Sequence, residues 1–377
     1  MIILRRCRSC NIFTLISSTL VFILFSLVFY ENLIPKQLPS IIINQLNLPF
    51  NKSEKFFAPE EYLKVQLNLT FNEALCHEDD YLLIYILSTV TNFERRKVIR
   101  STWGSKRNKT CFVFFVGKPT GLFTNTEIIE KRIVEERKQY QDIFQIDHEE
   151  SYANVVYKEI AALQWSMHFY PKISYLFKTD DDLIVDSILV SLIGQILVNN
   201  VAPNQSVISK HRPPLIAALL ESNRENFFRG GWAMDYQPTL RGFGKFAVSM
   251  DVWPHPVLPA YCSGFGWLMS RNIRDKLVKA SYTYPVRRTA WIGDVFISGF
   301  LARAAQVRCS GLHIDFEQTG SANCSCSMVN NPMLTVCSST FHAGGGGAEQ
   351  QKYLEYERAW RVIQLRHNLS HTTVDNC

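Results

Sequence analysis

The chain has 377 residues, of which 47% are apolar and 20% are charged, so it can bury a large core and is not disordered overall. Its 40 Lys and Arg residues exceed its 34 Asp and Glu residues and give a formal charge of +6. Three of these cations, Arg5, Arg6 and Arg8, precede the first apolar segment, and the others are diluted among acids. This pattern gives no support for nucleic-acid binding, which needs basic residues gathered on one face or helix.

The N-terminal region contains a segment of 19 uncharged residues, 12–30. A helix of this length rises roughly 30 Å, which matches the hydrocarbon core of a bilayer. A cleaved signal peptide is the alternative, but its apolar region is about 7–15 residues long and ends at small residues, whereas this segment ends in Phe29-Tyr30. With arginines before it and Glu31 after it, the positive-inside rule predicts a cytosolic tail (1–11), an uncleaved transmembrane signal anchor (12–30) and a luminal remainder.

Glycosylation signals and cysteines agree with a luminal remainder. All six Asn-X-Ser/Thr sequons follow the apolar segment, at Asn51, Asn68, Asn108, Asn204, Asn323 and Asn368. Of the ten cysteines, Cys7 and Cys10 precede the segment, and the eight that follow permit up to four disulfides in an oxidising compartment. Their pairing stays open. The spacing of Cys324, Cys326 and Cys337 is not that of a zinc site, so disulfides are favoured there.

Residues 31–77 are interrupted by four prolines among polar residues and show no sustained helical period. This composition predicts an extended luminal stem that holds a folded part away from the membrane. We take that folded part to be one domain, residues 78–377.

The folded part alternates between strand and helix patterns. The strand candidates are short apolar runs at 81–89, 111–117, 142–147 and 174–179. Helical spacing is found over 94–103 and 127–140, at Val156, Ile160 and Leu163, and over 348–367, while 213–261 is loop-rich and receives no assignment. The alternation predicts an α/β fold with a mostly parallel central sheet flanked by helices, and a ligand site at the carboxyl ends of the strands.

Asp180, Asp181 and Asp182 follow the last of these strands directly. Two carboxylates one residue apart at a strand end can approach one hard divalent cation, and such cations prefer oxygen ligands and are often shared with substrate phosphates. The alternative is a turn or a helix N-cap, because Asp is favoured there and a helix through Ile188 and Leu189 is expected next. On the residues alone both interpretations stay open.

Four blocks, in a fixed order, carry a resemblance to a known family. They are Arg95-Arg-Lys-Val-Ile-Arg-Ser-Thr-Trp-Gly104, Phe177-Lys-Thr-Asp-Asp-Asp182, Tyr261-Cys-Ser-Gly-Phe-Gly-Trp267 and Asp294-Val-Phe-Ile-Ser-Gly299. They resemble the Arg-Arg-x-x-Ile-Arg-x-Thr-Trp, Lys-x-Asp-Asp-Asp, Tyr-x-x-Gly-x-Gly-Tyr and Glu-Asp-Val-x-x-Gly blocks of the inverting glycosyltransferases of family 31, the beta-1,3-galactosyltransferase family. The resemblance covers nearly the whole luminal portion.

This resemblance implies a GT-A type nucleotide-sugar transferase fold in a single-pass type II Golgi membrane protein. The implied activity moves a hexose, galactose or N-acetylhexosamine, from a UDP-sugar donor to a hydroxyl of a glycan acceptor on lipid or protein in beta-1,3 linkage. Such an inverting reaction needs one carboxylate as general base for the acceptor hydroxyl and a divalent cation to stabilise the departing diphosphate.

The resemblance also implies roles for individual residues. Asp180 and Asp182 match the Asp-x-Asp pair that binds Mn²⁺ or Mg²⁺, with Asp182 as the more direct ligand. His342 falls where the family keeps a second, distant metal ligand, although a surface histidine beside a glycine loop is the alternative. Asp294 matches the general base.

Further residues match substrate-binding positions of the family. Arg95, Arg96, Arg100 and Asp181 would bind the nucleotide sugar; for the arginines, a solvated basic face is the competing interpretation. Gly264, Gly266 and Trp267 would lie against the substrates, since glycine lets a ligand approach the backbone closely, although it is also an ordinary turn former.

The chain departs from the family pattern at two places. The Glu that normally precedes the catalytic Asp is Gly293 here, and the Asp-x-Tyr-x-Asn-Leu-Thr block is Glu150-Ser-Tyr-Ala-Asn-Val-Val156. These changes leave the metal pair and the base in place but bear on donor choice, acceptor choice and rate. They also keep a second hypothesis open, a catalytically silent luminal subunit that binds glycans or stabilises a partner.

Overall fold

The computed structural model describes residues 75–107, 109–121, 125–202, 204, 206–284, 292–312, 315–317, 323–339, 341 and 349–369. The predicted cytosolic tail, the anchor and nearly all of the stem lie outside this part, as do His342, Asn51, Asn68 and Asn108. Among the described residues no helix has both the length and the apolar character needed to cross a bilayer.

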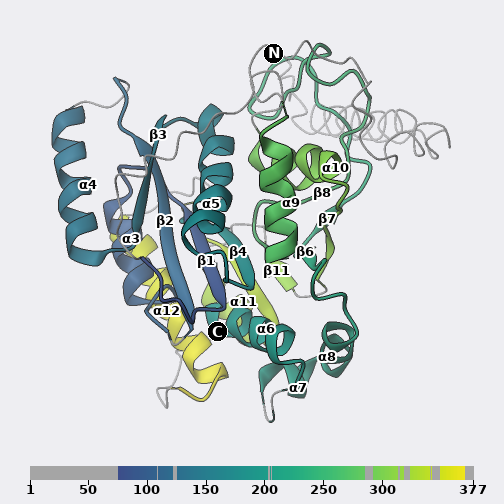
Figure 1. Cartoon of the computed structure of the whole chain (residues 1–377). Coiled ribbons are helices and arrows are strands. Elements are labelled where there is room, and N and C mark those ends of the chain that lie inside the picture. The colour runs from purple at the N-terminus through teal and green to yellow at the C-terminus, as the bar shows by residue number, and fades with distance from the viewer. Residues whose placement is uncertain are drawn as a thin grey trace, which may run out of the picture. The chain divides into compact units, whose positions relative to one another are not determined.

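The described region is built on a seven-stranded sheet with helices on both faces (Figure 1). The strand order is β10-β6-β9-β4-β1-β2-β3. In chain order the strands are β1 (Leu82–Leu87), β2 (Thr110–Lys118), β3 (Ile143–Glu149), β4 (Tyr175–Asp180), β6 (Phe228–Gly230), β9 (Trp267–Ser270) and β10 (Ser310–Gly311). β9 runs antiparallel to β4 and β6, and the other neighbours pair in parallel. The predicted α/β fold with a mostly parallel sheet is confirmed.

β1 lies near the centre of the sheet because all six of its residues are apolar enough to be buried on both faces. Leu82, Ile84 and Ile86 belong to the main apolar core. Tyr85 points to the other face, where its ring contacts Phe115 edge to face. The carboxyl ends of β1 and β4 are in register, with Leu87 opposite Asp180, so the aspartates that follow β4 emerge beside the end of β1.

The helices form a layer on each face of the sheet. α5 (Val155–Phe169), α9 (Arg271–Ser281) and the π-helix η2 (Val295–Leu301) pack together on one face, where α5 covers β1 and β2 (Figure 1). The other layer contributes to the main core and consists of α3 (Phe93–Ser101), α4 (Thr126–Tyr140), α6 (Ser187–Asn199) and α12 (Glu349–Arg366). The three-layer arrangement expected from the alternating pattern is therefore present.

Two smaller sheets and several short helices complete the described region. The small sheets are β11 (Asp315–Glu317), β12 (Leu334–Ser338) and β5 (Leu183–Val185), and β7 (Ala233–Met234) with β8 (Tyr261–Cys262). The short helices are η1 (Tyr152–Asn154), α7 (Val207–His211), α8 (Pro213–Leu220), α10 (Ala302–Ala304) and α11 (Cys324–Asn330). The unassigned stretch 213–261 contains α8 and only short strands, which explains its weak periodicity.

Disulfides join cysteines that follow the predicted anchor. The pairs Cys76–Cys111, Cys262–Cys309 and Cys324–Cys337 are formed, and Cys326 is also disulfide-bonded. Disulfides at 324–337, rather than a metal cluster, are thereby confirmed. Removing such a bond from a small secreted domain typically costs about 2–5 kcal/mol, so we expect these bonds to stabilise the fold.

Asp186 ties the C-terminal helix to the core. Its buried carboxylate accepts hydrogen bonds from the Leu189 backbone N–H at 2.9 Å, Arg366 Nη1 at 2.9 Å and His367 Nε2 at 3.0 Å. Burial opposes ionisation of Asp186, but His367, Arg366 and the Leu189 N–H outweigh it and lower the pKa of Asp186 below its usual 3.8. The charged carboxylate therefore stabilises the folded state.

This contact predicts an acid-dependent loss of stability. Because the folded-state pKa of Asp186 is depressed, its contribution is complete above pH 3.8 and is lost as the pH falls through the lower folded-state pKa. Each tenfold change in that acid constant is worth about 1.4 kcal/mol. Urea denaturation at pH 7 and pH 3 should show that the free energy of unfolding falls less between the two pH values for Asp186→Asn than for the unmodified chain. An equal fall in the two proteins would contradict this role for Asp186.

Candidate active site

A cavity of about 470 Å³ opens at the carboxyl ends of β1 and β4. We call it the aspartate cavity, because Asp180, Asp182 and Asp294 all line it. Arg95, Asp181 and Gly264 line it too. A second cavity, of about 740 Å³, lies at the other end of β4, beside Ser174, and none of the predicted site residues lines it.

Lys178 organises the floor of the aspartate cavity. Lys178 and Asp180 are two apart on β4 and so point to the same face of the sheet. Lys178 Nζ lies 2.8 Å from an Asp180 carboxylate oxygen and donates to the Gly264 carbonyl at 2.6 Å. Burial opposes the charge of Lys178, but Asp180 and further carboxylates raise its pKa, so it remains a cation. Asp180 is thus partly neutralised by its own strand.

Asp180 and Asp182 lie close enough to repel each other. Desolvation raises the pKa of Asp180, Lys178 opposes this, and the negative charge of Asp182 raises the pKa further. Repulsion between two carboxylates on one cavity wall is the situation that a bound cation relieves.

Asp181 points away from this pair and fixes Arg95. Its carboxylate accepts from Ser88 Oγ at 2.7 Å, Asn92 Nδ2 at 2.8 Å and Arg95 Nη1 at 3.3 Å. The Arg95 guanidinium also lies over the Phe341 ring, 4.2 Å from its centroid. Arg95 is therefore held at the cavity, and Asp181 contributes chiefly by positioning it.

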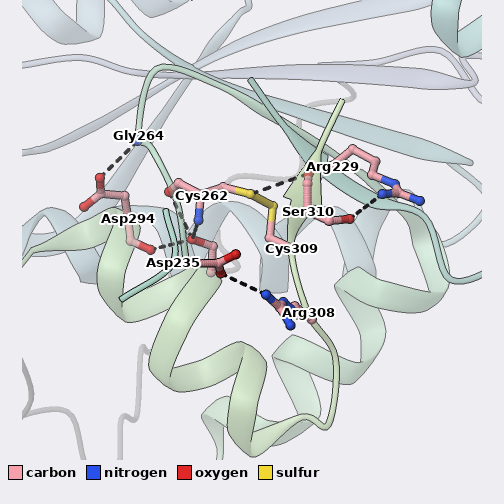
Figure 2. Close-up of a disulfide and its surroundings, with 9 residues drawn as sticks. Arg229, Asp235, Cys262, Gly264, Asp294, Arg308, Cys309 and Ser310 are labelled. Carbon is pink, nitrogen blue, oxygen red and sulfur yellow. Dashed lines mark hydrogen bonds and ion pairs between the residues drawn. A yellow bond between two sulfur atoms is a disulfide. The ribbon is translucent and has the colours of Figure 1, made fainter. Parts of the chain in front are cut away.

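Asp294 stands at the first turn of η2, facing the loop before β9. Its Oδ1 accepts from the Val295 N–H at 2.9 Å and its Oδ2 accepts from the Gly264 N–H at 3.0 Å, as Figure 2 shows for Gly264. Desolvation raises the pKa of Asp294, while Lys178 and these N–H groups oppose the rise. The result is an oriented carboxylate that is a stronger base than an ordinary Asp.

The structure corrects the expectation for two arginines. Arg96 is fully buried and pairs with Glu136 of α4 at 2.7 Å. Arg100 pairs with Glu136 at 2.6 Å and with Asp142 at 2.7 Å. Neither lines the aspartate cavity, because their side chains leave α3 on the face that packs against α4. These cations hold two helices together rather than facing a nucleotide.

This correction predicts that Arg96→Ala acts on stability. Removing one partner of a buried ion pair typically costs roughly 3–5 kcal/mol, because the remaining charge stays buried. We therefore expect a loss of this order in the free energy of unfolding, measured by urea denaturation, with the UDP affinity of the folded fraction unchanged. Arg95→Ala is the comparison: it should weaken UDP binding and cost less in stability than Arg96→Ala, because Asp181 keeps its hydrogen bonds from Ser88 and Asn92. The reverse outcome would restore the original expectation for Arg96.

Gly266 and Trp267 also lie outside the cavity lining. A Cβ at Gly266 would come within 2.8 Å of the Phe177 ring and 3.2 Å of the Lys178 carbonyl, so glycine is needed there for close packing on β4. Trp267 is fully buried, and its ring lies 5.2 Å from Lys178 Nζ. Both residues therefore support the cavity floor rather than contact a substrate.

Other predicted positions have a simpler outcome. His342 lies outside the described residues, so its proposed ligand role stays a prediction. The sequon residues Asn204, Asn323 and Asn368 are exposed, as glycosylation would require.

Sequence reasoning missed several residues that line the cavity. Lys158 and Glu159 come from α5, Tyr152 from η1, and Lys245 and Phe246 from the loop after β7. Lys158 pairs with Glu150 at 2.6 Å; that carboxylate also accepts from the Gly117 N–H at 2.8 Å. The altered block at residues 150–156 was the one signal for them in the sequence, because α5 begins within this block and continues through Lys158 and Glu159.

A protein-family model described as Galactosyltransferase matches residues 94–211 and 210–313, more than half of the chain. This chain belongs to the galactosyltransferase family. The family predicted from the four motif blocks is thereby confirmed, and the match spans all four aspartates that line the cavity.

Three members of the galactosyltransferase family show how the chain relates to characterised proteins. Human beta-1,3-galactosyltransferase 2 is 26% identical over 233 residues, 60% of this chain and 49% of that protein. Mouse UDP-GalNAc:beta-1,3-N-acetylgalactosaminyltransferase 1 is 26% identical over 261 residues, 66% of this chain and 71% of that one. Zebrafish lactosylceramide 1,3-N-acetyl-beta-D-glucosaminyltransferase B is 26% identical over 284 residues, which are 72% of this chain and 67% of that protein. This chain spans about half the length of the human protein.

Proposed function

We propose that this chain is an inverting glycosyltransferase that moves a hexose from a UDP-sugar onto a hydroxyl of a glycan acceptor in beta-1,3 linkage. The observation that carries the proposal is that Asp182 and Asp294 line one cavity at the ligand edge of the sheet. The family members named above, all beta-1,3-linking transferases by name, support the linkage. Their names specify three different sugars, so the donor is a galactose or an N-acetylhexosamine. The GT-A type of fold belongs to the same proposal.

Asp294 supplies the general base. As the acceptor hydroxyl attacks, its proton passes to the Asp294 carboxylate while its oxygen bonds to the anomeric carbon. The bond from that carbon to the diphosphate oxygen breaks, and its electron pair leaves with UDP. The Gly264 and Val295 N–H groups hold both carboxylate oxygens, so the base keeps its orientation before the proton arrives.

Mn²⁺ or Mg²⁺ is the cofactor that the donor set fits. The adjacent carboxylates of Asp180 and Asp182 provide the hard oxygen ligands these ions prefer, and their mutual repulsion favours a cation between them. As the family pattern implies, Asp182 is the more direct ligand, and Asp180, which pairs with Lys178, is the second. When bound, the ion stabilises the negative charge that develops on the departing diphosphate.

Arg95, together with Lys245 and Phe246 of the loop after β7, completes the surfaces that bind the substrates. Arg95, fixed by Asp181 and Phe341, presents a cation to the diphosphate. Lys245 lies 4.3 Å from the Tyr152 ring centroid, and both line the cavity with Phe246, whose side chain is 48% exposed. Aromatic faces and cations of this kind suit the apolar faces and hydroxyls of a sugar, so the acceptor is placed here.

The proposal also covers the membrane topology and the compartment of the protein. The sequence features of residues 1–30 and the disulfides support a single-pass type II protein of the Golgi membrane with its catalytic domain in the lumen. The acceptor is a glycan on lipid or protein.

A donor panel crossed with simple beta-linked glycan acceptors tests the proposal. We expect transfer from one UDP-hexose or UDP-N-acetylhexosamine, stimulated by Mn²⁺ and lost in chelator. A folded protein that transfers no common UDP-sugar would favour the silent glycan-binding or partner-stabilising subunit instead.

A further inference from the structure

Gly293 and Glu159 compete for one space beside Asp294. A Cβ added to Gly293 would lie 2.6 Å from Glu159 Oε1 and 3.2 Å from Val155 Cγ1. The backbone of Gly293 is not in the left-handed region, so a side chain there meets no backbone strain. The carboxyl of Glu159 is therefore the first group that a side chain at residue 293 would meet.

Glu159 is buried in the wall of the aspartate cavity. It is 1% exposed and lines the cavity together with Gly293 and Asp294. Its Oε2 is buried and has no hydrogen-bond partner among the described residues. Buried polar atoms nearly always have a partner, so an unpaired carboxyl oxygen in a cavity wall marks a place for a polar group from outside the chain.

The surroundings of Glu159 contain further buried polar atoms. Tyr85 Oη and Trp267 Nε1 are both buried and lie close enough to interact with each other. Burial raises the pKa of Tyr85 well above its usual value, and the charge of Glu159 adds to this, which places the two side chains near each other. Glu159 is thus part of a polar wall built into the core beneath the proposed base.

We propose that Glu159 is a substrate-positioning residue whose carboxyl occupies the space of a side chain at residue 293 and holds a hydroxyl of a bound sugar next to Asp294. This inference rests on the proposed function, since it names a further contact in the same cavity. The group that fits is a hydroxyl, because a carboxyl can both accept from it and, when protonated, donate to it. Either the donor sugar or the acceptor sugar can supply that hydroxyl.

The electrostatics of Glu159 show which substitution preserves its contacts. Desolvation raises the pKa of Glu159; Lys178 opposes the rise, and Asp180 and Asp294 add to it, giving a pKa of about 8. A pKa raised this far lets the carboxyl donate as well as accept a hydrogen bond near neutral pH. Glu159→Gln keeps its shape, one acceptor and a donor, whereas Glu159→Ala removes all of them.

Steady-state kinetics of the purified full chain separate positioning from a structural role. We expect Glu159→Ala to lower kcat/KM for transfer by about tenfold or more, and Glu159→Gln to stay within about threefold. The matched control is Gln164→Ala, because Gln164 is equally buried on α5 but bonds Ser281 and lies outside the cavity lining. If the hydroxyl belongs to the acceptor, only the acceptor KM rises; if it belongs to the donor, UDP-sugar hydrolysis without acceptor falls as well.

Gly293→Ala provides an independent test of the same contact. Its methyl group should displace the Glu159 carboxyl and lower transfer to an extent similar to that of Glu159→Ala. In the double variant, Gly293→Ala should lower transfer by less than about a further twofold. Effects that multiply in the double variant, or a folded Glu159→Ala enzyme with transfer within twofold of the unmodified chain, would overturn the inference.

The proposed function is judged separately, by transfer in the unmodified chain. If it transfers no sugar, calorimetric affinities for UDP-galactose, UDP and a beta-linked acceptor glycan still decide the Glu159 inference. It then requires Glu159→Ala to reduce either the preference for UDP-galactose over UDP or the affinity for the acceptor, at unchanged UDP affinity. If neither quantity changes, the inference is overturned.

Discussion

Asp294→Asn is expected to abolish measurable transfer, with kcat falling roughly 10²- to 10⁴-fold, the usual contribution of a general base. The Asn side chain keeps the shape of Asp294 and one oxygen for the N–H groups of Gly264 and Val295, but it cannot take the proton of the acceptor hydroxyl. UDP affinity should stay within about twofold, since Asp294 is assigned no contact with the nucleotide. Initial rates and calorimetric titration with UDP measure the two quantities.

Asp235→Asn is the matched control for this substitution. Asp235 is partly exposed and pairs with Arg308 at 2.8 Å, in the same region but outside the cavity lining (Figure 2). It should leave both rate and affinity unchanged. Near-normal transfer by Asp294→Asn would mean that another group removes the proton.

Asp182→Ala should remove the Mn²⁺-dependent part of UDP binding. The remaining candidate ligand, Asp180, is engaged by Lys178, so the substitution leaves no carboxylate devoted to the cation. We expect UDP affinity in Mn²⁺ to fall by at least about tenfold, which is about 1.4 kcal/mol, and to become equal to the affinity in chelator.

Asp147→Ala controls for the loss of an acidic side chain. Asp147 is exposed, pairs with Lys118 and lies away from the cavity. Its UDP affinity should keep the full response to Mn²⁺. A response of the same size in Asp182→Ala would remove the basis for a cation site at this strand end.

Much of this fold was predictable because its core strands carry strong local signals. β1 is apolar at every position, and β4 is an apolar run that ends at the aspartates. A parallel pairing of these strands then places Asp180 and Asp182 at the ligand edge without further information. β5 was missed because three residues cannot show a period.

The directions of individual side chains were less predictable. Arg95 and Arg96 are neighbours in the sequence, yet one reaches the cavity and the other is buried against Glu136, because adjacent helical residues point about 100° apart. Beyond the altered 150–156 block, no signal in the sequence indicated Glu159, since its proximity to Gly293 arises only when α5 packs beside the start of η2. Such contacts depend on tertiary packing rather than on local pattern.

The anomeric configuration of the first-formed product tests the central claim most directly. The claim is that one cavity holds the departing diphosphate near Asp182 while Asp294 takes the proton of an incoming hydroxyl. Proton NMR during transfer from an alpha-linked UDP-sugar should therefore show a beta-1,3-linked product from the earliest time point, formed in a single displacement. An alpha-linked product would contradict the account, because retention requires a different arrangement of nucleophile and base.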